Sequence, residues 1–207
     1  MDTFSGLIID GVTFGRTCIG LAVRPYETYR RIIHHGKNGE LVYVALLLGV
    51  YFAIASVVKV ADFRPFLLTQ QFLVLVLGAV SGALVATVSL AVAGRAFGAR
   101  IKIDSLLLGW SYTLIPTVSW FLATSVLYVL IPPPRTTSIL GVTFSLLFIV
   151  FSATLLWWKV TLSYLTMRFG LKLDLGKSAM VALLCAPGMA LWAWGMYSMG
   201  VFKVPFL

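Results

Sequence analysis

The side chains that carry most protein chemistry are few in this sequence, and their spacing does not favour joint action. The two histidines, His34 and His35, are adjacent, whereas a helix turns two imidazoles toward one metal ion when they stand four residues apart. The two cysteines, Cys18 and Cys185, stand in sequence contexts too different to indicate a pair. We therefore expect no metal site and no disulfide framework, and Cys18 fits a small buried thiol better than an acylation site.

The acidic residues are also poorly placed for catalysis or ion transport. All of them lie outside the five long apolar stretches of the chain: Asp2, Asp10, Glu27, Glu40, Asp62, Asp104 and Asp174. No Lys, Arg or His lies deep within those stretches either, although pumps and proton-coupled transporters need ionisable groups at mid-membrane. The sequence contains no phosphate-binding glycine loop and no nucleophile motif. It thus predicts neither an enzyme nor an ion-coupled transporter, and it implies no cofactor.

The composition indicates which elements must position any functional side chain. Of the 207 residues, 60% are hydrophobic and 11% are charged, against roughly 45–50% and about 25% in a soluble domain. So few charges cannot cover a water-facing surface, which excludes a soluble enzyme and a nucleic-acid binder despite the net charge of +9. A bilayer core about 30 Å thick needs roughly 20 apolar helical residues. Five stretches meet or approach that length, namely 41–58, 66–93, 106–131, 139–158 and 179–202.

These stretches predict an all-α integral membrane protein with a five-helix transmembrane domain over 41–207 and a separate N-terminal segment over 1–40. The connections on one side of the membrane carry 12 Lys and Arg residues and those on the other side carry 4. Because cytoplasmic loops hold the excess of positive charge, we place the N-terminus in the cytoplasm and the C-terminus on the extracytoplasmic side. No cleavable signal peptide is evident.

Residues 1–40 predict two short helices on the cytoplasmic side. The first, over 4–23, carries apolar residues at helical spacing, and the second starts at Pro25 and stops at Gly36. The segment fits an interfacial helix on the inner leaflet or a helix that docks a partner protein. Eight basic residues on this side are candidates for contact with anionic headgroups or partners: Arg24, Arg30, Arg31, Arg95, Arg100, Lys102, Arg168 and Lys172.

The two later cytoplasmic connections resemble each other. Each begins with Phe-Gly, at Phe97-Gly98 and at Phe169-Gly170, and continues as an alternating apolar and polar run. The glycines suit the left-handed end of a helix, and Ser105 and Ser178 suit the N-caps of the helices that follow. This similarity fits spans 2–3 and 4–5 as parallel copies of one helical hairpin, and a chance match between two membrane hairpins is the alternative. The alternating runs could pair with each other as short strands.

Small residues and prolines mark packing positions inside the spans. Gly78, Gly82 and Ala86 stand four residues apart, a pattern that lets two helix backbones approach closely. This stripe fits packing within the chain, and a dimer seam is the alternative. Pro116 and Pro187 lie inside the third and fifth spans and are expected to kink them.

Three stretches carry a resemblance to a known family. Residues 24–32 are similar to a proline-led helix before the first span, 103–116 to a third-span motif, and 157–179 to the connection into the last span. In these features the chain resembles the Yip1 domain family. The resemblance implies five spans, a cytosolic N-terminus and no catalytic residues. Eukaryotic members aid vesicle traffic and bind prenylated Rab GTPases and related family members. This chain departs from them in its short cytosolic N-terminal region and is closer to the compact prokaryotic members.

We therefore expect a non-enzymatic membrane adaptor or scaffold in the bacterial plasma (inner) membrane. Its expected partners are anionic lipid headgroups and other membrane proteins or further copies of itself, and no nucleic acid. The alternative is a permease or lipid-translocating subunit built around the two kinked hairpins. A third hypothesis is that the chain is a small subunit of a larger membrane complex.

Overall fold

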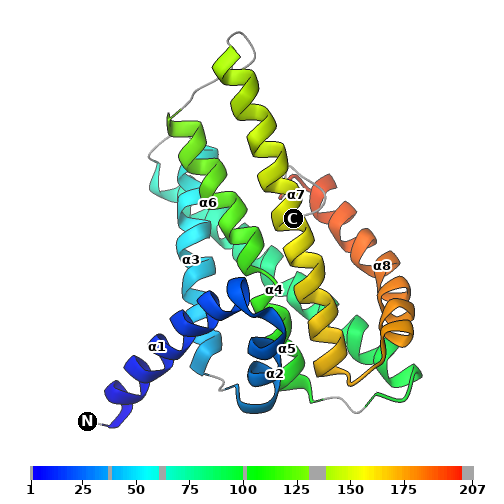
Figure 1. The fold of residues 1–207 in the computed structure, drawn as a ribbon. Coiled ribbons are helices and arrows are strands. Elements are labelled where there is room, and N and C mark those ends of the chain that lie inside the picture. The colour runs from blue at the N-terminus through cyan, green and yellow to red at the C-terminus, as the bar shows by residue number, and fades with distance from the viewer. Residues whose placement is uncertain (1, 37–38, 61–63, 100–101, 131–138, 202–207) are drawn as a thin grey trace.

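The computed structural model describes residues 2–36, 39–60, 64–99, 102–130 and 139–201. These residues form helices joined by turns and contain no strand (Figure 1). The helices are α1 (Asp2–Val23), α2 (Pro25–His35), α3 (Gly39–Val60), α4 (Pro65–Ala96), α5 (Ile103–Tyr112), α6 (Ile115–Leu130), α7 (Ile139–Gly170) and α8 (Leu175–Ser198). The predicted fold class of an all-α protein is thereby confirmed.

Five segments are long and apolar enough to cross a membrane: Gly39–Val57, Pro65–Ala96, Ile103–Leu127, Gly141–Gly170 and Leu175–Ser198. They correspond in number and order to the five predicted spans. The largest difference in bounds is at the fourth span, because α7 continues past Trp158 to Gly170. The continuation is stabilised by burial, since Leu162 and Leu165 beyond the expected end are almost fully buried.

The third span is two helices rather than one kinked helix. Helix α5 ends at Tyr112 and α6 begins at Ile115, with Pro116 in its first turn. Proline has no N–H, and its ring clashes with the carbonyl four residues earlier, so the α-helical hydrogen bond to Tyr112 cannot form. The N–H groups of Thr113 and Leu114 instead reach carbonyls three residues back, at 2.9 and 3.2 Å. Helix α8, by contrast, continues across Pro187.

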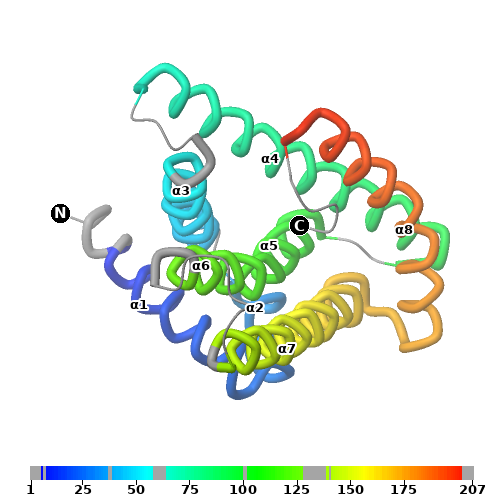
Figure 2. The backbone as a smooth tube through the Cα atoms, turned by 90° about the horizontal axis from the view of Figure 1, so that it is seen from above, coloured from blue at the N-terminus to red at the C-terminus, as the bar shows by residue number. Residues whose placement is uncertain are grey.

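Buried apolar side chains form two clusters near the end of the bundle that holds α2 and the α4–α5 and α7–α8 connections (Figure 1). The first core cluster joins α1, α2, α3, α5, α6 and α7 and consists of Leu21, Tyr29, Ile32, Val44, Leu108, Tyr112, Ile115, Leu162 and Leu165. The second joins α4, α5, α8 and the α7–α8 connection. Helix α8 lies along α4 rather than along α7, the helix that precedes it (Figure 2).

The α4–α5 connection begins with the predicted left-handed glycine, and its helix start differs from the prediction. Gly98 has φ 76°, and its N–H donates to the carbonyl of Arg95 while the N–H of Ala99 reaches that of Gly94, at 3.0 and 2.9 Å. These are the two bonds of a Schellman motif. Helix α5 is preceded by Lys102, so Ser105 lies within its first turn and the predicted serine N-cap is wrong.

The α7–α8 connection differs from the prediction at both ends. Helix α7 runs through Gly170, and the left-handed residue is Lys172, with φ 54°. The reversal buries both neighbours, Leu171 and Leu173, and leaves the Lys172 side chain exposed. Helix α8 starts after Asp174, and Ser178 is buried within it. Apolar burial thus selects the turn residue here, against the intrinsic preference for glycine.

Candidate lipid- and partner-binding face

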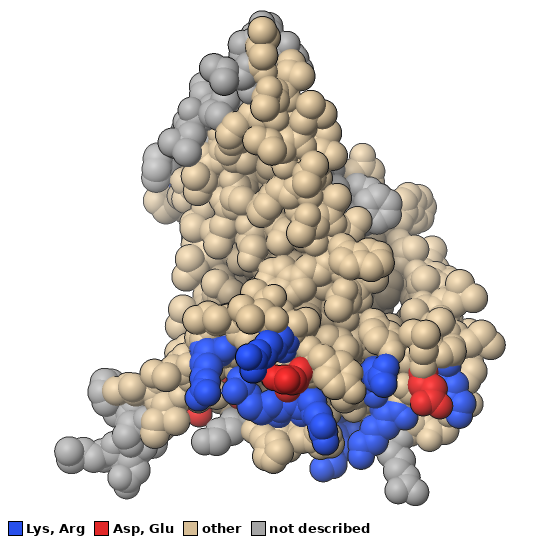
Figure 3. All heavy atoms as spheres, in the orientation of Figure 1, with Lys and Arg blue, Asp and Glu red and all other residues tan. Residues whose placement is uncertain are grey.

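The basic side chains of the described residues gather at one end of the molecule. Figure 3 shows Lys and Arg in a band over α1, α2 and the α4–α5 and α7–α8 connections, below a surface free of charge in this view. Seven of the predicted contact residues are exposed, and we call them the basic face: Arg24, Arg30, Arg31, Arg95, Lys102, Arg168 and Lys172. The eighth, Arg100, lies outside the described residues.

The arginines of α2 are positioned by a tyrosine on the opposite side of that helix. Tyr29 is fully buried in the first core cluster. Its hydroxyl donates to the carbonyl oxygen of Gly109 in α5 at 2.9 Å and lies 3.3 Å from Thr166 Oγ1 in α7. Burial raises the pKa of Tyr29, so the hydroxyl stays a neutral donor. Since Tyr29 and Ile32 face the core, Arg30 and Arg31 face outward.

The end of α2 at Gly36 requires glycine because of close contacts and not because of a left-handed backbone. Gly36 follows the helix, but its φ of −62° is not left-handed. A Cβ at this position would overlap the carbonyl oxygen of Ile32 and a methyl group of Leu108. Close approach of α5 therefore selects the residue.

Helix α1 is held against the bundle by the face that the sequence indicates. Phe14 stacks on Tyr43 and Tyr112, with ring centroids 5.8 and 6.1 Å apart, and Leu21 is fully buried. A second apolar stripe on α1 is exposed and consists of Ile8, Val12, Ile19 and Val23. Sequence reasoning missed this stripe, although its spacing of four, seven and four residues is a helical signal.

A buried polar contact lies behind the basic face. Glu40 is only 4% exposed and accepts a hydrogen bond from the Tyr112 hydroxyl. The sequence places Glu40 outside the apolar stretch, but it lies in the first turn of α3 and within the segment able to span the membrane. Burial and the Glu40 charge raise the pKa of Cys18 to about 11. The Cys18 thiol is therefore protonated at neutral pH and a poor nucleophile.

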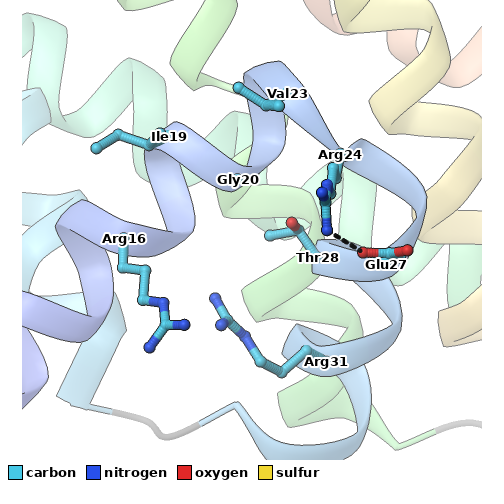
Figure 4. Close-up of a pocket in the computed structure, with 8 residues that line it drawn as sticks. All are labelled: Arg16, Ile19, Gly20, Val23, Arg24, Glu27, Thr28 and Arg31. Carbon is cyan, nitrogen blue, oxygen red and sulfur yellow. Dashed lines mark ion pairs between the residues drawn. The ribbon is translucent and has the colours of Figure 1, made fainter.

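An open groove of about 440 Å³ lies between α1 and α2, and we call it the α1–α2 groove. Its lining consists of Arg16, Ile19, Gly20, Val23, Arg24, Glu27, Thr28 and Arg31. Figure 4 shows Arg16 and Arg31 pointing toward one another from the two helices. The helices meet closely here, since a Cβ on Gly20 would lie 2.6 Å from Thr28 Oγ1. Arg24 pairs with Glu27 at 3.7 Å on the exposed side.

The remaining described members of the basic face surround the connections. Arg168 Nη1 donates to the Tyr164 hydroxyl at 2.8 Å, and its guanidinium lies 5.8 Å from the centre of the Tyr26 ring. Arg95 is in the last turn of α4, Lys102 precedes α5, and Lys172 lies in the turn before α8. The tertiary fold thus brings cations from three parts of the chain, α2 and the two connections, to one end.

The predicted packing residues lie in the interior. Gly78, Gly82 and Ala86 of α4 are buried. A Cβ on Gly82 would lie 2.7 Å from the ring of Trp192 in α8, and the Trp192 indole N–H donates to Ser81 Oγ at 3.2 Å. In the monomer, the Gly82 part of this stripe therefore contacts α8.

No group of three or more His, Cys, Asp or Glu side chains able to hold a metal ion is present among the described residues. The exposed imidazoles of His34 and His35 have ring centroids 6.4 Å apart. Cys18 and Cys185 are both free thiols. The chain matches no protein-family model, and no curated protein or solved structure is significantly similar to it.

Proposed function

We propose that this chain is a non-enzymatic multi-pass membrane adaptor that uses the basic face to contact anionic lipids and membrane-protein partners. One observation carries the proposal: exposed cations from separate segments gather at one end of a bundle whose spans are long and apolar. A surface of this kind attracts anionic headgroups and acidic protein segments.

The same observation supports an orientation and a location. With the basic face on the cytoplasmic side, the exposed cations lie where the positive-inside rule requires them. The N-terminus is then cytoplasmic and the C-terminus extracytoplasmic. The long apolar spans place the protein in a membrane, and we propose that this is the bacterial plasma membrane.

We extend the proposal to membership of the Yip1 domain family. The stretches 24–32, 103–116 and 157–179, which carry the resemblance, meet at a single point in the first core cluster. Tyr29 from the first stretch donates to Gly109 in the second and lies 3.3 Å from Thr166 in the third. Segments that pack on one another must retain compatible side chains, so their joint resemblance supports a common fold.

The proposal is tested by purification in mild detergent after site-specific photo-crosslinking. We expect a crosslinker at Arg30 on the basic face to capture a stoichiometric membrane protein. A crosslinker at Leu84, 60% exposed on α4, is the control and should capture mainly lipid. Capture of the same protein from both positions, or of no protein from Arg30, contradicts the adaptor.

Charge reversal gives a second, independent test. Lys102→Glu with Lys172→Glu should abolish capture while membrane insertion stays normal. Arg64→Glu is the control, because Arg64 precedes the N-terminal end of α4, whereas Arg95 of the basic face lies at its C-terminal end. Intact capture by the double variant argues against the basic face as the contact surface.

A second candidate function rests on the division of the third span. Broken helices line binding sites in some transporters, and the Thr117 hydroxyl in α6 is buried without a hydrogen-bond partner. A permease or lipid-translocating subunit would move fluorescent lipid or solute across reconstituted vesicles. Lost movement with intact partner capture in the Lys102→Glu, Lys172→Glu variant would favour this function over the adaptor.

A further inference from the structure

We propose that the α1–α2 groove is a binding site for one anionic phospholipid, with the lipid phosphate between Arg16 and Arg31. This inference rests on the proposed function for the position of the groove at the membrane surface. It adds a defined ligand class, a site and a stoichiometry, whereas the basic face as a whole would only attract negative charge.

The cationic side of the groove has the geometry that a phosphate group requires. Arg16 and Arg31 come from facing helices and point toward one another (Figure 4). Arg31 is held in place because its Nη2 donates to Thr17 Oγ1 at 3.0 Å, and Thr17 is only 1% exposed. A guanidinium donates two parallel hydrogen bonds to a phosphate. Two converging guanidiniums, one of them pre-positioned, therefore make a phosphate clamp.

The other side of the groove identifies the phosphate as part of a lipid. Ile19 and Val23 line it and are 69% and 71% exposed, and Figure 4 shows them on the side away from Arg16 and Arg31. They continue the exposed stripe of α1 through Val12 and Ile8. A soluble phosphate compound gains nothing from this apolar track, whereas an acyl chain removes it from water and gains the free energy of apolar burial.

The charges that line the groove select an anionic headgroup. Three arginines and a single carboxylate give it a net charge of about +2. Glu27 pairs with Arg24 at 3.7 Å, which leaves Arg16 and Arg31 as the cations that face each other. A phosphatidylcholine headgroup would bring its own cation to this surface and be disfavoured. A phosphatidylglycerol headgroup adds only its negative charge and hydroxyl groups.

The experiment measures lipid retained by the full chain in detergent, by native mass spectrometry with titrated lipid. The probes are palmitoyl-oleoyl phosphatidylglycerol and phosphatidylcholine, with sn-glycerol 3-phosphate as the soluble competitor. We expect one phosphatidylglycerol per chain, bound at least about tenfold tighter than phosphatidylcholine. Millimolar glycerol phosphate should not displace it. Displacement would identify a soluble phosphate site, and equal binding of the two lipids would overturn the proposal.

Matched variants locate the site. Arg16→Gln with Arg31→Gln should weaken phosphatidylglycerol binding by roughly tenfold or more. Arg64→Gln with Lys177→Gln removes the same charge outside both the groove and the basic face and should leave this binding within about twofold. An equal loss in both variants would mean diffuse attraction and would overturn the proposal. Arg31→Gln also removes a guanidinium that is bonded to Thr17, so Arg16→Gln alone is the second variant. Its loss of phosphatidylglycerol binding should exceed that of Lys177→Gln.

A substitution in the opposite direction checks the role of Glu27. Glu27→Gln frees Arg24 from its ion pair and should tighten phosphatidylglycerol binding by up to about fivefold, the range of an exposed pair. Unchanged or weaker binding would show that Arg24 and Glu27 do not shape the site.

The same variants distinguish failure of this inference from failure of the proposed function. If none of the groove variants changes phosphatidylglycerol binding while the Arg30 crosslinker still captures a protein, the lipid site in the groove is refuted and the adaptor proposal stands. If phosphatidylglycerol binds in the groove as expected but no protein is captured, the adaptor is wrong and lipid handling takes its place.

Discussion

Replacement of Tyr29 by Phe tests whether one hydroxyl fixes α2 and the basic face. In α5 the carbonyl of Gly109 would normally accept the N–H of Thr113, but that N–H bonds to Trp110 instead. The break before Pro116 thus leaves the Gly109 carbonyl without a helical donor, and Tyr29 supplies one at 2.9 Å. The tyrosine caps α5 from a different helix.

The magnitude follows from the burial of this contact. Both Tyr29 and Gly109 are buried, so Tyr29→Phe leaves a carbonyl oxygen with neither protein nor bulk water to bond. Such a loss costs about 1–3 kcal/mol. At about 2–4 °C per kcal/mol for a chain of this size, the apparent Tm should fall by roughly 2–12 °C.

The assay is thermal unfolding in detergent, followed by tryptophan fluorescence. Tyr26→Phe is the matched control, because Tyr26 lies one turn earlier on α2 and is 49% exposed, and its apparent Tm should change by less than about 2 °C. An unchanged Tm for Tyr29→Phe, or an equal fall in the control, would refute the capping argument. If α2 loosens, the crosslinking yield from Arg30 should fall as well.

Two further predictions concern the interior. Gly82→Ala places a methyl group against the Trp192 ring and should destabilise the protein by about 1–3 kcal/mol in thermal unfolding. Gly49→Ala is the control and should be neutral, because a Cβ at Gly49 meets no atom within 4 Å. Equal effects of the two substitutions would contradict the α4–α8 contact. In a variant that retains only Cys18, maleimide labelling at pH 8 should be roughly 100-fold slower than for an ordinary thiol, because burial and Glu40 raise the Cys18 pKa to about 11. The rate should rise as the pH approaches 11, and Glu40→Gln should speed labelling in part; a normal rate would show that the thiol is neither buried nor near the carboxylate.

The first core cluster has a consequence for how the basic face behaves. Arg30 and Arg31 project from a short helix that packs through Tyr29 and Ile32 against α5 and α7. Helix α2 is therefore part of the bundle rather than a free amphipathic segment on the lipid. A partner or lipid that binds the basic face contacts a surface whose geometry is fixed by the membrane helices.

The number of spans could be predicted because it depends on local properties. A stretch of about 20 apolar residues must satisfy its own backbone hydrogen bonds in lipid, and a helix does this without reference to the rest of the chain. The basic residues of the predicted cytoplasmic side could be identified for the same reason, since charge placement along the chain is visible in the sequence. The end of α7 was missed because Leu162 and Leu165 are apolar residues beyond Lys159, and only packing makes them helical core.

The sequence by itself determined five long apolar segments able to span a membrane as helices, with the cations outside the apolar stretches, because hydrophobic length and charge act residue by residue. Only the tertiary structure decided which side chains meet. Arg16 and Arg31 are separated by a helix end and converge because Gly20 lets α1 and α2 approach. Tyr29 reaches Gly109 across 80 positions of sequence because the turn before Pro116 opens a carbonyl there. Contacts between distant segments depend on the packing of whole helices, and no local pattern encodes that packing.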